Sequence, residues 1–372
     1  MIVGIPKEIK DHEYRVGIVP SGVRTLAEAG IKVIVEKSAG IGSNIPDNEY
    51  EESGAEIVES AKEVYEKSDM IIKVKEPLEE EYDYLREDLI LYTFLHLASS
   101  RSLTEELLKR KVTAIGYETI QLENGLLPLL TPMSEIAGKL SVQVGASFLE
   151  KERGGRGVLL GGVPGVLPGK VIIIGGGTAG INAAKIACGM GAEVTVLDIK
   201  QEKMAYIEDI FGSRIFTLIS NSKNIEEKAA EADLLIGAVL IPGKKAPKII
   251  PREVIKKMKE GSVFVDISVD QGGCAETTKP TTHSNPVFKE EGVIHYCVTN
   301  IPSAVACTST YALTNVTLPY ALKIAKEGFR NAVSNDKALA KGVNTYQGKL
   351  VCQAVAESFE MEFSPLNSLI QF

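Results

Sequence analysis

The chain has 372 residues, of which 44% are hydrophobic and 24% charged, and this predicts a globular protein of two domains. Its formal net charge of −8 argues against nucleic acid as a main partner. The sequence contains no apolar run as long as a membrane span, and its first residues, MIVGIPKEIK, lack the apolar core of a signal peptide. We therefore expect a cytoplasmic protein that has no membrane partner.

Five cysteines are scattered along the chain without a C-x-x-C pair. This spacing indicates reduced thiols, and it predicts neither a disulfide framework nor a zinc site. We expect no metal in the protein.

The first 128 residues alternate between strand-like and helix-like patterns. Strands are predicted at 2–5, 32–36, 70–74, 89–94 and 113–117, and helices at 21–29, 61–67 and 103–111. Such alternation is typical of a mostly parallel α/β sheet. Because this region has no glycine fingerprint of its own, we expect it to hold the substrate.

A helix start follows, with Thr131 as a cap, Pro132 in the first turn and Glu135 near the positive end of the dipole. The pattern predicts a helix from 131 to about 152. The next stretch, 154–169, contains seven glycines and two prolines, so we expect a loop with special backbone conformations beside the next domain.

Segment 170–198 carries the strongest motif, KVIIIGGGTAGINAAKIACGMGAEVTVLD. It has the order strand, G-x-G-x-x-G turn, helix, strand and acid, as in a dinucleotide-binding βαβ unit. Gly175 allows the tight turn, Gly177 lets a pyrophosphate approach the backbone, and Gly180 lets the helix pack close to the sheet. The helix N-terminus then offers N–H groups and a positive dipole end to the pyrophosphate.

Asp198 lies 18 residues after Gly180, where a carboxylate can accept hydrogen bonds from the adenosine ribose. Its negative charge disfavours a 2′-phosphate, so the sequence predicts NAD rather than NADP. Lys200 and Lys203 lie close by and weaken this preference.

Further strands are predicted at 234–239, 263–267 and 293–298. Ligands bind outside the carboxyl ends of strands in open α/β sheets, and Asp270 and Asn300 follow two of those ends. A helix over 309–327 comes next, and Pro319 predicts a break or kink in it.

The order of these segments predicts the architecture. We expect an α/β protein with two doubly wound, Rossmann-like domains. The NAD-binding domain, 129–305, is inserted into a discontinuous substrate and catalytic domain, 1–128 plus 306–372, because the C-terminal helices are expected to pack back on the first domain.

Four polar residues are candidates for chemistry on a small amino or hydroxy acid. This chemistry needs cations for the carboxylate and carbonyl and a proton carrier near neutral pH. Arg15 offers a fork for a carboxylate, and Lys75 and His96 directly follow apolar runs. Asp270 precedes two glycines, while Asp266, which alternates with it, also suits a structural role. The alternatives are a salt-bridge arginine, a solvated lysine, a core histidine and a turn-capping aspartate.

These residues, in this order, resemble the alanine dehydrogenase family, which includes the nucleotide-binding part of proton-translocating transhydrogenases. The resemblance extends over nearly the whole chain. The matching stretches are GIPKEIKDHEYRVGIVPSGV, KVKEP, TFLHLAS, LPLLTPMSEIAGKL, GGRGVLLGGVPGV, GGGTAGINAA, VTVLDI, LIGAVLIPG, DISVDQGGC, TTHSNPVF and STYALTNVTLPYAL.

The resemblance implies a role for each candidate. Arg15, Lys75 and Asn300 would bind the substrate, and His96 and Asp270 would be the acid–base pair. Besides the glycine turn of Gly175, Gly177 and Gly180, the residues implied to contact NAD are Ser134, Thr178, Ala179, Asp198, Lys203, Ser220, Val239, Leu240, Ile267, Val298 and Ile301.

The implied reaction is the reversible conversion of L-alanine, NAD and water to pyruvate, ammonia and NADH, in a homo-oligomer that is a hexamer in this family. One stretch departs from the family pattern N-[MI]-P-x-x-V-P-[RK]-T-S-T, because Ala306 replaces its second proline and Cys307 the basic residue. Two alternatives remain open: a soluble NAD(H)-binding subunit of a transhydrogenase, and a related dehydrogenase of the saccharopine type.

Overall fold

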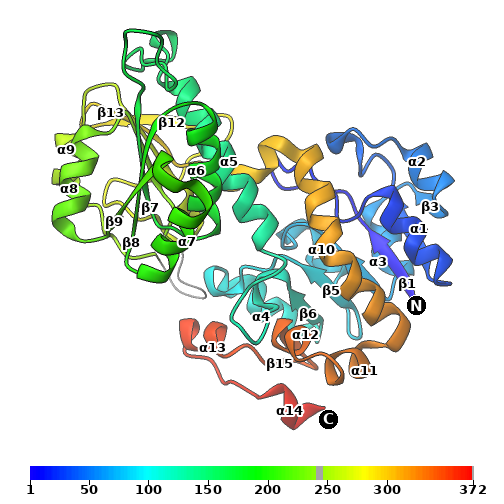
Figure 1. Cartoon of the computed structure of the whole chain (residues 1–372). Helices are drawn as coiled ribbons and strands as arrows, with labels where there is room; N and C mark the ends of the chain where they lie inside the picture. Colours follow the sequence, from blue (N-terminus) through cyan, green and yellow to red (C-terminus); the bar gives the residue numbers. More distant parts are fainter. Residues whose placement is uncertain (240–245, 371–372) are drawn as a thin grey trace. The chain divides into compact units, whose positions relative to one another are not determined.

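The computed structural model describes residues 1–239 and 246–370. The chain divides into two compact units (Figure 1). Unit 1 comprises Met1–Met133 and Ser303–Phe372, and unit 2 comprises Ser134–Pro302. Each unit is built on a sheet of mostly parallel strands, which confirms the predicted α/β class.

In the described part of unit 1, the strand order is β15-β14-β6-β5-β4-β1-β2-β3. The strands are β1 Ile2–Ile5, β2 Lys32–Glu36, β3 Ala55–Val58, β4 Met70–Ile72, β5 Ile90–Thr93, β6 Thr113–Gly116, β14 Val343–Tyr346 and β15 Lys349–Leu350. Strands β1 to β6 are parallel, whereas β14 and β15 are antiparallel additions at the β6 edge. The parallel part has the doubly wound order 3-2-1-4-5-6, which reverses between β1 and β4.

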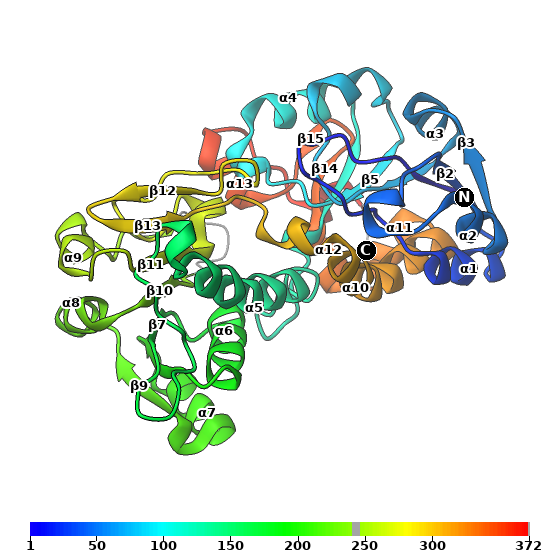
Figure 2. The same cartoon turned by 90° about the horizontal axis from the view of Figure 1, so that it is seen from above.

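Helices cover both faces of the unit 1 sheet (Figure 2). On one face, α3, α4 and α13 share an apolar cluster that includes Tyr65, Leu91, Leu103 and Val355. The other face carries α1, α10, α11 and α12. The bounds of the helices in this unit are α1 Pro20–Glu28, α2 Asp47–Glu52, α3 Ala61–Lys67, α4 Arg101–Lys109, α10 Ala306–Glu327, α11 Phe329–Ser334, α12 Lys337–Gly342, α13 Gln353–Phe359 and α14 Leu366–Leu369.

The described part of unit 2 has the strand order β12-β13-β11-β10-β7-β8-β9. The strands are β7 Lys170–Ile174, β8 Glu193–Asp198, β9 Ile215–Ile219, β10 Leu234–Gly237, β11 Val263–Asp266, β12 Val287–Glu290 and β13 Val293–Tyr296. All pairs are parallel except β12 with β13. Apart from the added β12, the order is again 3-2-1-4-5-6, and it reverses between β7 and β10.

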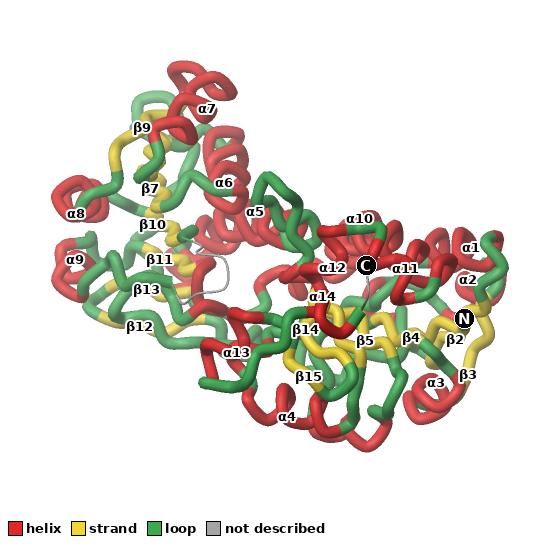
Figure 3. Tube along the Cα trace, turned by 90° about the horizontal axis from the view of Figure 1, so that it is seen from below, coloured by secondary structure: helices red, strands yellow, loops and turns green. Residues whose placement is uncertain are grey.

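Two helix layers cover the unit 2 sheet (Figure 3). Helices α8 and α9 pack on one face through a cluster that includes Ile172, Ile225 and Ile255, and α5 and α6 cover the other face. The helices are α5 Thr131–Phe148, α6 Thr178–Gly189, α7 Gln201–Phe211, α8 Ser222–Glu231 and α9 Arg252–Lys257. The backbone of α5 approaches α6 closely, since a Cβ on Gly138 would overlap the carbonyl oxygen of Ala179.

Local chemistry explains where several helices begin. The side chains of Ser60, Ser100 and Asn221 accept backbone N–H bonds at the first turns of α3, α4 and α8. The central parallel strands are rich in β-branched residues, as in the KVIII of β7, and are buried on both faces, whereas the edge strands β3 and β9 are partly exposed.

Several predicted element ends differ from the structure. Strands β4, β10 and β13 end at Ile72, Gly237 and Tyr296, two residues before the predicted ends. The predicted break at Pro319 is also wrong, because α10 runs through it: the one hydrogen bond that proline removes is offset by the packing of the many buried residues of this helix. The alternative, a kink at Pro319, stays a prediction. Helix α5 ends at Phe148 rather than near 152. A separate 3₁₀ turn, Lys151–Arg153, follows it and ends at Gly154, which has a φ of +86°. Strand β11 ends at Asp266, because that side chain caps the short 3₁₀ turn Ile267–Gln271.

Candidate functional site

Arg15 lies on the segment that follows β1, beside the point where the strand order of unit 1 reverses. The side chain is 2% exposed and forms a two-point salt bridge with Glu13, with Nε to Oε1 at 2.6 Å and Nη2 to Oε2 at 2.5 Å. Its Nη1 lies 3.1 Å from the sulfur of Met133. The structural salt bridge that the sequence left open as an alternative therefore exists, and it fixes the plane of the guanidinium.

Lys75 follows β4, on the other side of the same reversal. Its backbone is held at both ends, because its N–H donates to Glu8 Oε1 at 3.3 Å and its carbonyl accepts the Thr93 hydroxyl at 3.0 Å. The residue is 8% exposed, so it is not the solvated loop lysine of the alternative.

A buried charge cluster supports this end of β4. Lys73 Nζ lies 3.4 Å from Glu8 Oε2 and 2.7 Å from Glu81 Oε1, and all three side chains are buried. Glu8 also accepts the N–H of Val74 at 2.6 Å. Burial raises the pKa of Glu8 to about 7, with Lys73 opposing the shift and the nearby Glu13 carboxylate adding to it.

His96 follows β5 in a left-handed backbone conformation, with a φ of +50°. Glu118 accepts its N–H at 2.6 Å and that of Leu95 at 3.1 Å, which stabilises the unusual turn. The side chain is 37% exposed, so it is not a core histidine. Its Nδ1 lies 3.3 Å from Glu76 Oε2.

Glu76 connects His96 with the lysines around it. Its other oxygen pairs with Lys10. Burial alone would raise the pKa of Glu76, but His96, Lys75 and Lys10 together hold it well below its usual range. A carboxylate on Nδ1 orients the imidazole ring and leaves Nε2 for proton exchange.

The glycine turn of unit 2 follows β7. Gly175 has a φ of +110°, and a Cβ on Gly180 would overlap the carbonyl oxygen of Gly175. In contrast, a Cβ on Gly177 would meet nothing closer than Lys203 Nζ at 3.9 Å. The space beside Gly177, at the N-terminus of the twelve-residue helix α6 with Thr178 and Ala179 in its first turn, therefore fits a pyrophosphate.

Asp198 ends β8 next to this turn and is buried. Its Oδ2 accepts the N–H of Gly176 at 2.7 Å and lies 3.4 Å from Lys203 Nζ, while Oδ1 accepts the N–H of Lys200 at 2.9 Å. Ser220, after β9, donates its N–H to the Asp198 carbonyl at 2.9 Å. These bonds fix a carboxylate beside the glycine turn, where the ribose of a dinucleotide binds in such folds.

The remaining predicted residues of unit 2 lie at the start of α5 or after strand ends. Ser134 lies in the first turn of α5, Val239 follows β10, and Ile267 and Asp270 follow β11; Val298, Asn300 and Ile301 follow β13. Asp270 is exposed, and its Oδ1 accepts the N–H of Asn300 at 3.3 Å. Leu240 lies outside the described residues.

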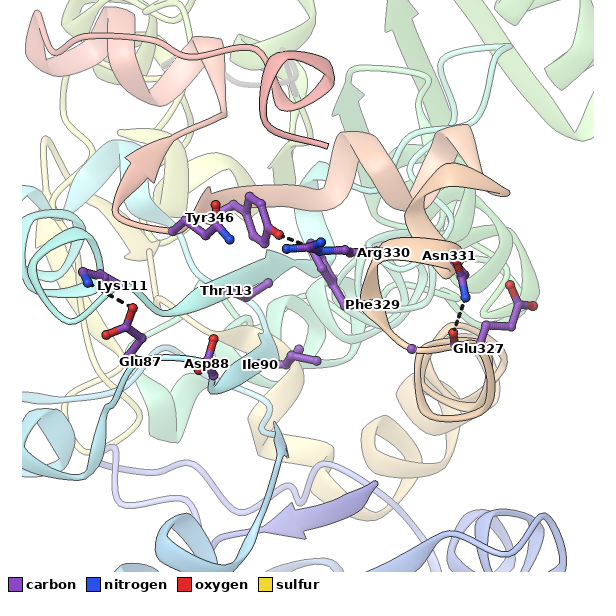
Figure 4. Close-up of a pocket in the computed structure, with 12 residues that line it drawn as sticks. Glu87, Asp88, Ile90, Lys111, Thr113, Glu327, Phe329, Arg330, Asn331 and Tyr346 are labelled. Atoms are coloured by element: carbon purple, nitrogen blue, oxygen red, sulfur yellow. Dashed lines mark hydrogen bonds and ion pairs between the residues drawn. The ribbon is translucent and has the colours of Figure 1, made fainter. Parts of the chain in front are cut away.

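A pocket of about 700 Å³ lies at the opposite end of the unit 1 sheet (Figure 4). It opens where β5 and β6 begin, and it is lined by Ile90, Thr113, Arg330 and Tyr346 among others. None of the predicted site residues lines this pocket. Over the described ranges, no group of three or more His, Cys, Asp or Glu side chains is arranged to hold a metal ion. In the same ranges, no helix is long and apolar enough to cross a membrane.

Comparison with known proteins identifies the family. The family model "Alanine dehydrogenase/PNT, N-terminal domain" matches residues 4–137, and "Alanine dehydrogenase/PNT, C-terminal domain" matches residues 141–353. The chain belongs to the alanine dehydrogenase/PNT family. Membership confirms the resemblance seen in the sequence and makes the chain an oxidoreductase that uses a pyridine nucleotide.

Full-length relatives support the same assignment. The chain is 57% identical to an alanine dehydrogenase of Methanococcus maripaludis over 98% of both chains, and 54% identical to alanine dehydrogenase 2 of Staphylococcus aureus over all of both chains. A solved L-alanine dehydrogenase is 55% identical, with a TM-score of 0.94 over 97% of this chain and 99% of that one. A transhydrogenase from Sinorhizobium meliloti, 24% identical over 95% of this chain and all of that one with a TM-score of 0.81, shares the fold.

Sequence reasoning missed four carboxylates that hold the predicted site residues in place. Each of these carboxylates binds a predicted site residue or its backbone: Glu8, Glu13, Glu76 and Glu118. The first three lie on loops and Glu118 lies in the short 3₁₀ turn Tyr117–Thr119, where acidic residues are ordinarily solvated. One signal was present: Lys73 stands within an apolar run, and a buried lysine requires a buried acid. Of the two departures from the family pattern, Ala306 is buried at the start of α10 and Cys307 is exposed.

Proposed function

We propose that this protein catalyses the reversible NAD-dependent oxidative deamination of L-alanine to pyruvate and ammonia. The observation that carries the proposal is the grouping in unit 1. Arg15, Lys75 and His96 all follow carboxyl ends of strands on either side of the reversal in strand order, where ligands bind in open α/β sheets. Two cations and a histidine are the groups that an α-amino acid and its keto acid require.

In the proposed reaction, L-alanine, NAD⁺ and water give pyruvate, ammonium, NADH and a proton. NAD held at the glycine turn would supply the acceptor for the hydride of the alanine Cα. Loss of this hydride, and of a proton from the ammonium group, leaves an iminium. Arg15 and Lys75 bind the carboxylate and the later carbonyl oxygen, and Asn300 contacts the substrate. Water then attacks the iminium carbon, and the carbinolamine collapses to pyruvate and ammonia.

His96 and Asp270 exchange the protons of these steps. The contact from Glu76 to Nδ1 supports this role for His96, since it holds the ring so that Nε2 carries the exchange. Asp270 suits an acid–base role because it is an exposed carboxylate on a loop that its neighbours hold in place.

We propose NAD rather than NADP as the cofactor, because the fixed Asp198 carboxylate would repel a 2′-phosphate. The other proposed contacts are those predicted above for the glycine turn and the strand ends. Replacing Asp198 with Ser is expected to raise KM for NAD about tenfold or more, since hydrogen bonds to charged groups contribute about 1.5–3 kcal/mol. The ratio of kcat/KM for NADP to that for NAD should rise. An unchanged ratio would reject this role.

The test of the function is NADH formation at alkaline pH from NAD and L-alanine. The variants are His96→Ala and Asp270→Asn, with Asp209→Asn, an exposed aspartate on α7, as the matched control. We expect alanine-dependent NADH in the wild type and the control, and a large loss of kcat in both test variants. A wild type that binds NADH tightly but forms none from alanine would favour the transhydrogenase subunit instead.

We also propose a cytoplasmic homo-oligomer, a hexamer as the family resemblance implies. Light scattering on the purified protein measures its mass directly. A monomeric mass would reject the oligomer.

A further inference from the structure

Asp266 is a carboxylate buried completely at the end of β11. Its Oδ1 accepts the N–H of Ser268 at 2.9 Å, and its Oδ2 accepts the N–H of Cys274 at 2.8 Å and the Thr278 hydroxyl at 2.5 Å. No cation forms an ion pair with it among the residues described. Burying a carboxylate is costly unless several donors satisfy it, and here the donors all come from the loop that follows.

Those donors are Ser268, near the start of the loop 267–278, and Cys274 and Thr278 in its second half. The loop leaves Asp266, passes through the 3₁₀ turn Ile267–Gln271 and returns to the same carboxylate. The return is tightly packed, because a Cβ on Gly273 would overlap the Thr278 side chain and one on Gly237 would overlap the Cys274 sulfur. The Asp266 carboxylate therefore holds the first and second halves of the loop together through hydrogen bonds.

The loop also holds a neighbouring strand end. The Ser268 hydroxyl donates to the Val239 carbonyl at 2.8 Å and accepts the Val239 N–H at 3.0 Å. Asp270 lies between the two anchored ends, and its carboxylate accepts the N–H of Asn300. One buried carboxylate thus organises the backbone that carries a proposed catalytic group and a proposed cofactor contact.

We propose that Asp266 is a positioning residue that acts through Asp270. The inference rests on the proposed function of Asp270. A group that only stabilises unit 2 would change the melting temperature without a specific effect on kcat, whereas a positioning group changes turnover through the residue it places. Small displacements of a reacting group can cost on the order of 100-fold in rate.

The experiment compares Asp266→Asn with Asp233→Asn in the full-length protein. Asp233 is another buried aspartate of unit 2, but it lies just before β10, at the amino ends of the strands, whereas Asp266 lies at the carboxyl end of β11. It accepts the N–H of Lys170 at 2.9 Å and pairs with Lys259 at 3.0 Å. We expect both variants to lower the melting temperature, and only Asp266→Asn to lower kcat, by about 10- to 100-fold.

A double-variant cycle tests whether the effect passes through Asp270. If it does, Asp266→Asn combined with Asp270→Asn is no slower than Asp270→Asn alone. The proposal would be overturned if the kcat losses of the two single variants multiplied in the double variant. It would also be overturned by an Asp266→Asn variant with wild-type kcat. A wild type without alanine-dependent activity would reject the proposed function and this role together, whereas an active wild type with multiplied defects rejects the role alone.

Thr278 gives a milder perturbation should the Asp266 variant fail to fold or the Asp270 variant show no turnover. Thr278→Val removes one hydrogen bond to Asp266, and Thr278→Ser retains it. We expect kcat to fall in the valine variant and to recover in the serine variant. Equal kcat in both would overturn the proposal.

Discussion

Replacing Glu8 with Gln should flatten the pH dependence of the stability of unit 1. Glu8 is buried, and its pKa is raised from 4.5 to about 7 in the folded chain. Between these values the folded state holds a proton that the unfolded state releases, so the free energy of unfolding falls as pH rises. At about 1.4 kcal/mol per unit of pKa shift, protonation of Glu8 contributes about 3 kcal/mol to the free energy of unfolding. This contribution is present in full below pH 4.5 and is lost as pH rises through 7.

Hydrogen exchange along a urea titration, followed in peptides that span β1 and β4, measures the stability of this unit separately. Between pH 4.5 and pH 8, we expect the free energy of unfolding of the wild type to fall by about 3 kcal/mol more than that of Glu8→Gln. The control is Glu80→Gln, because Glu80 is exposed on the segment that follows β4. A Glu8→Gln variant with the same pH dependence as the wild type would show that the Lys73 ammonium compensates for burial, and would refute the reasoning.

Further predictions concern the glycine turn and the histidine. Gly180→Ala should abolish NADH binding or the folding of unit 2, because the added Cβ would overlap the Gly175 carbonyl oxygen. The control is Gly189→Ala, at the other end of α6, which should leave binding and folding intact because the space around Gly189 is open. Equal NADH titrations for the two variants would contradict this. Glu76→Gln should lower kcat, because the His96 imidazole loses the carboxylate that orients its ring. An unchanged kcat would mean that this contact does not affect catalysis.

The sequence by itself determined the features that depend on local chemistry. Alternating strands and helices indicated the α/β class, which the structure confirms. The glycine turn could be recognised because two of its glycines meet a backbone requirement within one βαβ unit: Gly175 adopts a positive φ, and Gly180 lies against the Gly175 carbonyl. Lys75 and His96 were found as candidates because they directly follow apolar strands.

Only the tertiary structure decided which side chains meet. Glu8 and Lys75 are 67 residues apart, and His96 and Glu76 are 20 apart, so no local pattern pairs them. The same holds for Pro319, whose helix continues because distant residues bury its face. The physical reason is general: backbone conformation follows from neighbours in the chain, whereas burial and charge pairing follow from neighbours in space.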